Sequence, residues 1–195
     1  MTKDQLLASG TALVTRFCEA NDLEMPAVRS YRPEEWRFDS VCAYYRPTAI
    51  HIALSRCAHP GRAGMSWSWP GYVIDRTPHG VMAHELGHHV DHVLSKIKGA
   101  YGGDFSVQLR AKTGEPKITN YCPNDWEWFA EIFRLFVTNP DLLHALRPNT
   151  YAELRERLEL VEMRPWTKVL EGAPERTVAQ AWKKIAEVPR QGMLL

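Results

Sequence analysis

The stretch His84-Glu85-Leu86-Gly87-His88 carries the strongest structural signal in this sequence. It lies in a segment that opens with a capping threonine and a first-turn proline, Thr77 and Pro78, and keeps apolar residues at helical spacing to about Lys96. Two histidines four residues apart on a helix project from the same face, about one turn from each other. We therefore expect a helix that presents both imidazoles to one point.

These two imidazoles can hold one zinc ion, because zinc binds histidine nitrogens at roughly 2.0 to 2.1 Å and keeps one position open for water in a catalytic site. Zinc lowers the pKa of such a water from 15.7 to about 7. Glu85 is placed to take the proton of the water as general base and to pass it to a leaving amine as general acid. The competing interpretation makes His84 and His88 ordinary polar residues of an exposed helix face.

Other residues near the motif are expected to pack around the metal site or to support its ligands. His79, His89 and His92 lie off the motif face or outside its spacing, and for each we expect a surface position or a supporting role around the ligands. Gly87 lowers helix propensity by roughly 1 kcal/mol relative to alanine. This cost indicates that a side chain at residue 87 would crowd a segment packed beneath the metal.

A catalytic zinc needs three protein ligands, and the candidates for the third are Glu127, His92 and Cys42. The metzincin pattern does not apply, because Leu94 stands where it requires a histidine and Asp91 stands where it requires a glycine. The distance of Cys42 from the motif resembles that of the cysteine ligand in peptide deformylases, but the residues around it do not match their motif. We expect Cys42 to be a structural strand residue.

Two glutamates, Glu127 and Glu131, lie one helical turn apart in an otherwise apolar segment from Asp125 to Val137. Carboxylates on such a helix must face water, a partner or a metal. Glu127 can coordinate zinc while Glu131 accepts the remaining ring proton of a ligating histidine and fixes its tautomer. The alternative is a capping box that Asn124 and Glu127 form at the start of the helix.

Two longer motifs carry a resemblance to a known family. They are His-Glu-Leu-Gly-His-His-Val-Asp at residues 84 to 91 and Asn-Asp-Trp-Glu-Trp-Phe-Ala-Glu-Ile-Phe-Arg-Leu at residues 124 to 135, joined through Ile118-Thr119-Asn120-Tyr121. With them, the region resembles the catalytic part of the gluzincin metallopeptidases that include anthrax lethal factor and the bacterial Pro-Pro endopeptidases. The resemblance implies that Glu127 is the third zinc ligand and that Tyr121 donates to the oxyanion. The competing interpretation of Tyr121 is a core aromatic.

The fold class expected is α+β: a helix-rich, zincin-like metallopeptidase fold with a small sheet and an active-site helix that carries the motif. Further helices are expected near residues 2–20 and 105–112, from Asn139-Pro140, and from Thr150 with Glu153, and two strands are expected around a turn at residues 46–48. By analogy with the family, the half-buried strand near Ile50 to Leu54 is expected to be the sheet edge that pairs with a peptide.

Two domain-level segments are expected. Residues 1–165 are predicted to form the zincin-like domain, and residues 166–195 a C-terminal extension with one helix near residues 175–187. Residues 56–71 read as an irregular loop, in which Trp67 and Trp69 either fold onto the core or line a substrate cleft.

The composition of the chain indicates which classes of partner and which cellular compartment to expect. The 195 residues carry 24 Lys and Arg against 23 Asp and Glu, with no long run of one sign, which argues against nucleic acid or a membrane as partner. The four cysteines are widely spaced and form no CxxC pair, which is typical of reduced thiols. We expect a cytoplasmic protein, or one exported without a signal peptide.

The function that these patterns favour is zinc-dependent endopeptidase activity on a protein or peptide substrate. Two other classes stay open: a catalytically silent zinc-binding module, and a zinc hydrolase of a non-peptide amide. The presence of Glu85 argues against the silent module, which needs ligands but no general base. The sequence leaves the substrate, the cleavage site and the oligomeric state unspecified.

Overall fold

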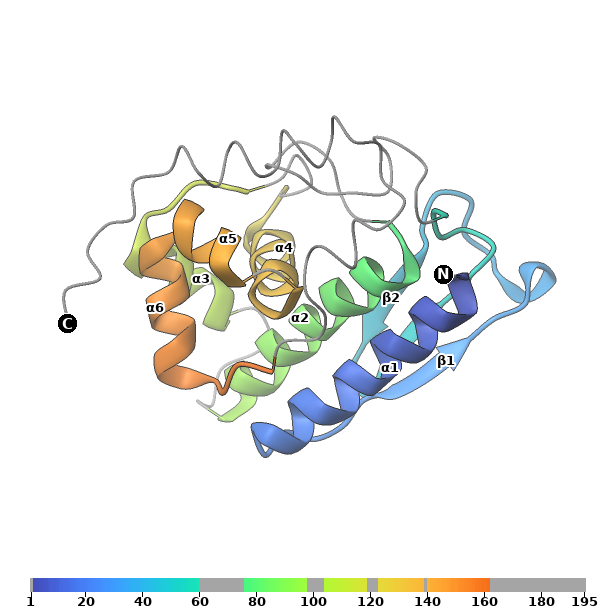
Figure 1. Cartoon of the computed structure of the whole chain (residues 1–195), viewed down its shortest axis with the longest axis horizontal. Coiled ribbons are helices and arrows are strands. Elements are labelled where there is room, and N and C mark those ends of the chain that lie inside the picture. The colour runs from blue at the N-terminus through green and yellow to red at the C-terminus, as the bar shows by residue number, and fades with distance from the viewer. Residues whose placement is uncertain (1, 60–75, 98–103, 119–122, 139, 162–195) are drawn as a thin grey trace.

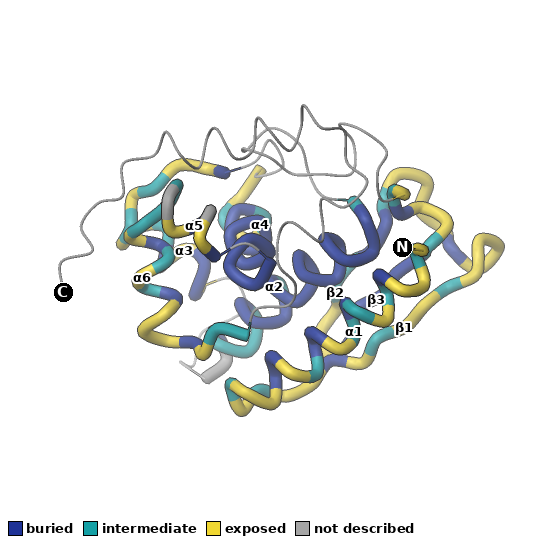
Figure 2. The backbone as a smooth tube through the Cα atoms, viewed as in Figure 1, coloured by how far each residue is buried: buried dark blue, intermediate teal, exposed yellow. Residues whose placement is uncertain are grey.

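The central element of this α+β protein is helix α2 (Pro78–Ile97), which contacts helices α1, α3 and α4 and strands β2 and β3 (Figure 1). The structure, a computed structural model, describes residues 2–59, 76–97, 104–118, 123–138 and 140–161. Figure 2 shows α2 and α4 as the most continuously buried helices, whereas α1 and α6 keep exposed outer faces. The motif helix thus lies inside the molecule, where its side chains face neighbouring elements.

Helix α1 (Lys3–Ala20) begins as the sequence predicts. The hydroxyl of Thr2 accepts from the backbone N–H of Gln5 at 3.2 Å, and the Gln5 side chain accepts from the N–H of Thr2 at 2.9 Å, which completes a capping box. Its apolar stripe is buried at Leu6, Leu13 and Phe17 and packs beside α2. The N-terminal helix therefore packs directly against the motif helix.

The sheet is small and mixed, with strand order β1-β3-β2. Strand β1 (Ala27–Ser30) pairs parallel with β3 (Ala49–Ile52), and β2 (Ala43–Arg46) pairs antiparallel with β3. The predicted pair of strands around residues 46–48 is confirmed. The expected edge strand is wrong, because β3 lies in the middle of the sheet and is buried along its whole length. The two edge strands are β1 and β2. A single 3-10 turn at Pro33–Glu35 precedes β2 in the described residues.

Helices α2 and α4 (Asp125–Thr138) approach each other closely at Gly87. A Cβ atom on residue 87 would lie 2.8 Å from the Cα of Ala130 and 3.1 Å from the Cβ of Phe133. Contacts this short are not tolerated in a packed core. The glycine thus lets α4 lie against the motif helix. The segment that a side chain at residue 87 was expected to crowd is α4.

The remaining described helices are α3 (Asp104–Thr113), α5 (Pro140–Leu146) and α6 (Pro148–Arg157). The helices expected near residues 105–112 and from Pro140 are confirmed, but the start expected at Thr150 is wrong because α6 begins at Pro148. The Glu115 carboxylate accepts from the backbone N–H of Asn149 at 3.1 Å and of Thr150 at 2.8 Å, so a distant side chain caps this helix.

Three expectations fall on residues that the structure does not describe: the loop placement of Trp67 and Trp69, the boundary after residue 165, and the helix near residues 175–187. Of the helices that are described, none combines the length and the apolar composition needed to cross a lipid bilayer.

Candidate metal centre

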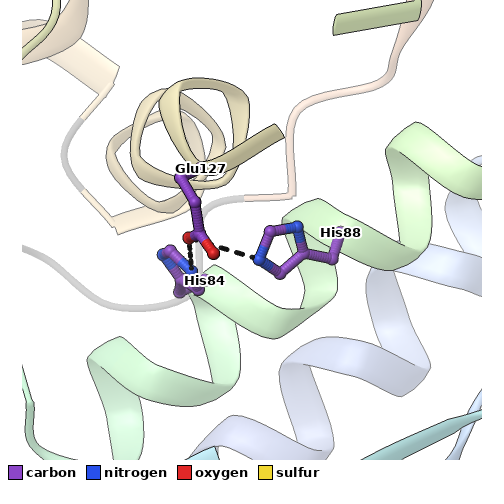
Figure 3. Close-up of side chains that lie close together, drawn as sticks. All are labelled: His84, His88 and Glu127. Atoms are coloured by element: carbon purple, nitrogen blue, oxygen red, sulfur yellow. Dashed lines mark hydrogen bonds and ion pairs between the residues drawn. The ribbon is translucent and has the colours of Figure 1, made fainter. Parts of the chain in front are cut away.

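Three predicted ligands, His84, His88 and Glu127, converge between α2 and α4 (Figure 3). The Glu127 Oε2 atom lies 3.0 Å from His84 Nε2 and 3.5 Å from His88 Nε2. Ligand atoms that share a tetrahedral zinc lie about 3.4 Å apart, given bonds of roughly 2.05 Å. The two distances to Glu127 are close to this spacing, and all three ligand atoms lie within 4.8 Å of one another. The three side chains can therefore hold one ion and leave the fourth position to a water or a substrate.

A buried carboxylate, Glu131, lies behind the first histidine. Its Oε1 atom is 2.8 Å from His84 Nδ1, the ring nitrogen that does not face Glu127. The Arg134 guanidinium donates to both oxygens of Glu131, through Nε at 3.2 Å and Nη2 at 3.0 Å. Both side chains are completely buried. Because each ring nitrogen of His84 has a fixed partner, the imidazole is held in one orientation.

The charges of this network shift the pKa of Glu131, Glu127 and His84. Burial alone would favour the neutral forms, but the Arg134 charge and the hydrogen bond to His84 lower the pKa of Glu131 to about 2. The pKa of Glu127 is also lowered to about 2, since its bonds to both histidines outweigh its burial. For His84, burial is outweighed by the bonds to Glu127 and Glu131, which raise its pKa to about 10. Without a metal, His84 is therefore a cation held between two anions.

The carboxylate of Glu85 lies next to the ligands and differs from them in its surroundings. The side chain is 5 % exposed, and its Oε2 atom has no hydrogen-bond partner among the described residues. Burial raises the pKa of Glu85, although the neighbouring histidines and a backbone hydrogen bond from Tyr45 oppose the shift. A buried acceptor with a raised pKa and a vacant lone pair is suited to receive a proton from a molecule in the cleft.

These groups line a cleft of about 490 Å³. Ala43, Tyr44 and Tyr45 of β2 form part of its wall, and Trp126, which is 52 % exposed, stands beside Glu127. Strand β2 is one of the two edge strands and pairs with β3 alone among the described strands. The cleft thus combines the ligands with an edge strand, whose Tyr45 backbone donates to the Glu85 carboxylate. The cleft can therefore receive an extended chain along β2.

The alternative third ligands, Cys42 and His92, do not belong to the ligand cluster. Cys42 does not join the ligand cluster found among the described residues: its Sγ atom accepts from Arg76 Nη2 at 3.1 Å. His92 lines the cleft but is also outside the cluster. The capping-box alternative is half present, since Asn124 Oδ1 accepts from the Glu127 N–H at 2.9 Å. The Glu127 carboxylate, however, turns toward the histidines instead of completing the box.

Of the two roles expected for His79, His89 and His92, a surface position or a supporting role, the surface position is wrong for His79 and His89, which are 0 % and 2 % exposed. His89 bonds the Tyr45 hydroxyl through Nδ1 at 3.1 Å and the Glu24 carbonyl through Nε2 at 2.6 Å, so it ties α2 to the sheet region. The exposed-face interpretation of His84 and His88 is also wrong, because their side chains are only 11 % and 19 % exposed. Tyr121 lies outside the described residues.

The sequence reasoning did not include Arg134 or the Tyr45 backbone among the residues around the site. A signal for Arg134 was present, because it follows Glu131 by three residues on the same helix face. No pattern in the sequence marks the backbone of Tyr45, since that contact arises only when β2 packs against α2.

Comparisons with known proteins add no relative. No family model, curated protein or solved structure matches this chain. The resemblance stated from the motifs therefore stays a prediction, and the geometry of the site carries the functional argument.

A substitution of Glu131 by glutamine tests the support of His84. We expect zinc affinity to fall by roughly 10- to 100-fold, the usual cost of losing a partner that orients a metal-bound histidine. Competition with a chromogenic chelator measures the affinity, and circular dichroism shows that the variant is folded. Glu153→Gln is the control, because that carboxylate pairs with Lys112 and Arg157 and not with the site. Equal zinc affinity in Glu131→Gln and the wild type would leave Glu131 without a role at the metal.

Proposed function

We propose that this chain is a zinc-dependent endopeptidase with a gluzincin site and a zincin-like fold. The observation that carries the proposal is the convergence of His84, His88 and Glu127 around one point. Beside them lies a carboxylate oxygen of Glu85 that has no hydrogen-bond partner in the part of the chain that the structure describes. A silent binding module needs the three ligands only. The additional buried acceptor favours catalysis.

The residues present fit zinc. Two imidazole nitrogens and one carboxylate oxygen are a ligand set of catalytic zinc sites. A bound zinc supplies Lewis acidity toward the substrate carbonyl and acidifies water. The three ligands fix the position of the ion, and Glu131 with Arg134 fixes the orientation of His84.

Glu85 is the residue that moves protons in this proposal. Its Oε2 atom, which no described residue contacts by a hydrogen bond, accepts the proton of the attacking water, and the same carboxyl group then protonates the amine that leaves. The hydrogen bond from the Tyr45 backbone holds the carboxylate in place on the β2 side of the cleft. The pKa of Glu85 is raised toward neutral pH, which suits a group that must both take and return a proton.

The edge strand β2 supports a peptide over a small amide as substrate. An extended peptide can add to this edge by main-chain hydrogen bonds, which places its backbone along the cleft that Ala43, Tyr44 and Tyr45 help to form. The exposed Trp126 offers apolar surface on the α4 side. A small amide would use neither feature.

Identification of new peptide termini after incubation with a cell lysate tests the function directly. We expect zinc-loaded protein to generate cleavage products at defined sequences, and we expect none after chelation, with recovery when zinc is added back. A protein that binds one zinc per chain but releases no new termini from proteins or peptides would contradict the endopeptidase assignment. Turnover of small amides alone would favour the non-peptide alternative.

Zinc binding is expected to release a proton and to strengthen as pH rises. The pKa of His84 is raised to about 10, so its proton competes with zinc at every lower pH, whereas Glu127 and Glu131 are ionised well below neutrality. One released proton corresponds to a roughly tenfold gain in affinity per pH unit below that pKa. Calorimetry in buffers of different ionisation enthalpy counts the protons. Affinity that is constant between about pH 7 and pH 9 would contradict the proton competition at His84.

A further inference from the structure

Three segments that are distant in sequence meet at the start of β2. Arg76, two residues before α2, donates through Nη2 to the Ser40 carbonyl at 2.9 Å and to Cys42 Sγ at 3.1 Å. The turn that follows β3 joins them, because the Ala58 N–H donates to the Arg76 carbonyl at 2.8 Å. The guanidinium therefore fastens the beginning of β2 to the segment that leads into the motif helix.

Two thiols lie side by side at this junction. The Cys42 Sγ atom lies 3.1 Å from the carbonyl oxygen of Arg56, the residue directly before Cys57, and the two thiols influence each other's pKa. Both cysteines are buried, with exposed fractions of 6 % and 4 %. The backbone holds them together, since the Ala53 N–H donates to the Cys42 carbonyl at 2.9 Å and the Cys57 Sγ atom lies 3.5 Å from the Ala53 carbonyl.

The two thiols are chemically unequal. The hydrogen bond from Cys57 and the bond and charge of Arg76 outweigh burial and lower the pKa of Cys42 to about 6. The partner thiol Cys57 keeps its proton, because donation to Cys42 and burial raise its pKa. Cys18 provides an internal comparison: it is buried in the core, and burial there raises its pKa to about 11. Burial by itself therefore does not activate a thiol in this protein.

We propose that Cys42 and Cys57 form a hydroperoxide-sensitive dithiol, with Cys42 as the attacking sulfur and Cys57 as the resolving one. The Cys42 thiolate attacks one oxygen of hydrogen peroxide, the O–O bond breaks, and a sulfenic acid and hydroxide form; the hydroxide takes up a proton to give water. The Cys57 thiol then attacks the sulfenic sulfur, a disulfide forms, and a second water leaves. Two electrons pass from the two thiols to the peroxide, which balances the reaction.

The disulfide changes the junction in two ways. It removes the anionic partner of Arg76, whose chain leads into α2, and it links the turn after β3 to the residue that directly precedes Ala43 in the cleft wall. This inference does not depend on zinc or on proteolysis, and its test uses neither.

The test uses the full-length metal-free protein in a Cys122→Ser background, which removes the fourth cysteine of the sequence. The native protein is exposed to hydrogen peroxide at about pH 7, free thiols are alkylated after unfolding, and peptides are identified by mass spectrometry. We expect a Cys42 to Cys57 disulfide, with Cys18 recovered in alkylated form. Because the pKa of Cys42 is lowered and that of Cys18 is raised, we expect oxidation of Cys42 to be at least about tenfold faster than that of Cys18.

Two variants assign the roles. In Cys57→Ser we expect the sulfenic acid of Cys42 to persist and to be trapped by dimedone. Arg76→Gln removes the guanidinium charge, and we expect oxidation of Cys42 to slow by about tenfold, with recovery in Arg76→Lys. Circular dichroism on each sample verifies the fold. The proposal is overturned if folded protein forms no Cys42 to Cys57 disulfide, if Cys18 oxidises as fast, or if Arg76→Gln reacts at the wild-type rate.

Discussion

Glu85→Gln is expected to lose nearly all turnover and to keep both its zinc and its fold. An amide has the size and shape of the carboxylate, and its oxygen can still accept the hydrogen bond from the Tyr45 backbone. It cannot accept the proton of the attacking water at the position where Glu85 Oε2 now lies unpartnered within the described residues. The loss of a positioned general base lowers kcat by about 100- to 10,000-fold.

Steady-state kinetics on a cleaved peptide, with zinc content and a thermal melt on the same sample, measure this effect. We expect the Tm to stay the same or to rise, because the substitution removes a charge from a buried position. Glu156→Gln, an exposed carboxylate on α6, is the matched control and should keep its kcat. Wild-type kcat in Glu85→Gln at full zinc occupancy would remove Glu85 from the mechanism.

Glu127→Ala is expected to lose zinc, with a larger drop in affinity than the roughly 10- to 100-fold that follows the loss of a supporting residue. Glu127 supplies the one carboxylate in the ligand cluster found among the described residues, and its carboxylate lies within hydrogen-bonding distance of His84. Without it, two histidines of the cluster remain as ligands. Two ligands are too few for a catalytic zinc site.

Elemental analysis and chelator competition decide this prediction against the alternative third ligand. Asp125→Ala is the matched control, because Asp125 precedes Trp126 on the same turn but pairs with Arg110 at 2.5 Å. We expect Cys42→Ser to retain zinc, since that thiol is held by Arg76 and Cys57. Full zinc occupancy in Glu127→Ala together with loss in Cys42→Ser would transfer the third position to Cys42 and favour a deformylase-like site.

Local patterns in the sequence were sufficient for the helices that carry the site. The period of an α-helix places His84 and His88 on one face wherever the helix packs, and Thr77-Pro78 and Asn124 mark starts that depend on nearby residues alone. The capping box of α1 was readable for the same reason. Strand β1 could not be predicted from the sequence, because its four residues are mostly exposed and obtain their hydrogen bonds from β3.

The contacts between elements were decided by the tertiary structure. The histidine spacing could not show that Glu127 reaches both imidazoles, because that depends on how closely α4 lies against α2 at Gly87. The same holds for the start of α6, where Glu115 supplies the cap from another segment. Periodicity and capping describe a residue's neighbours along the chain. A three-ligand site joins two helices, so its geometry exists only once their packing has fixed the distance between them.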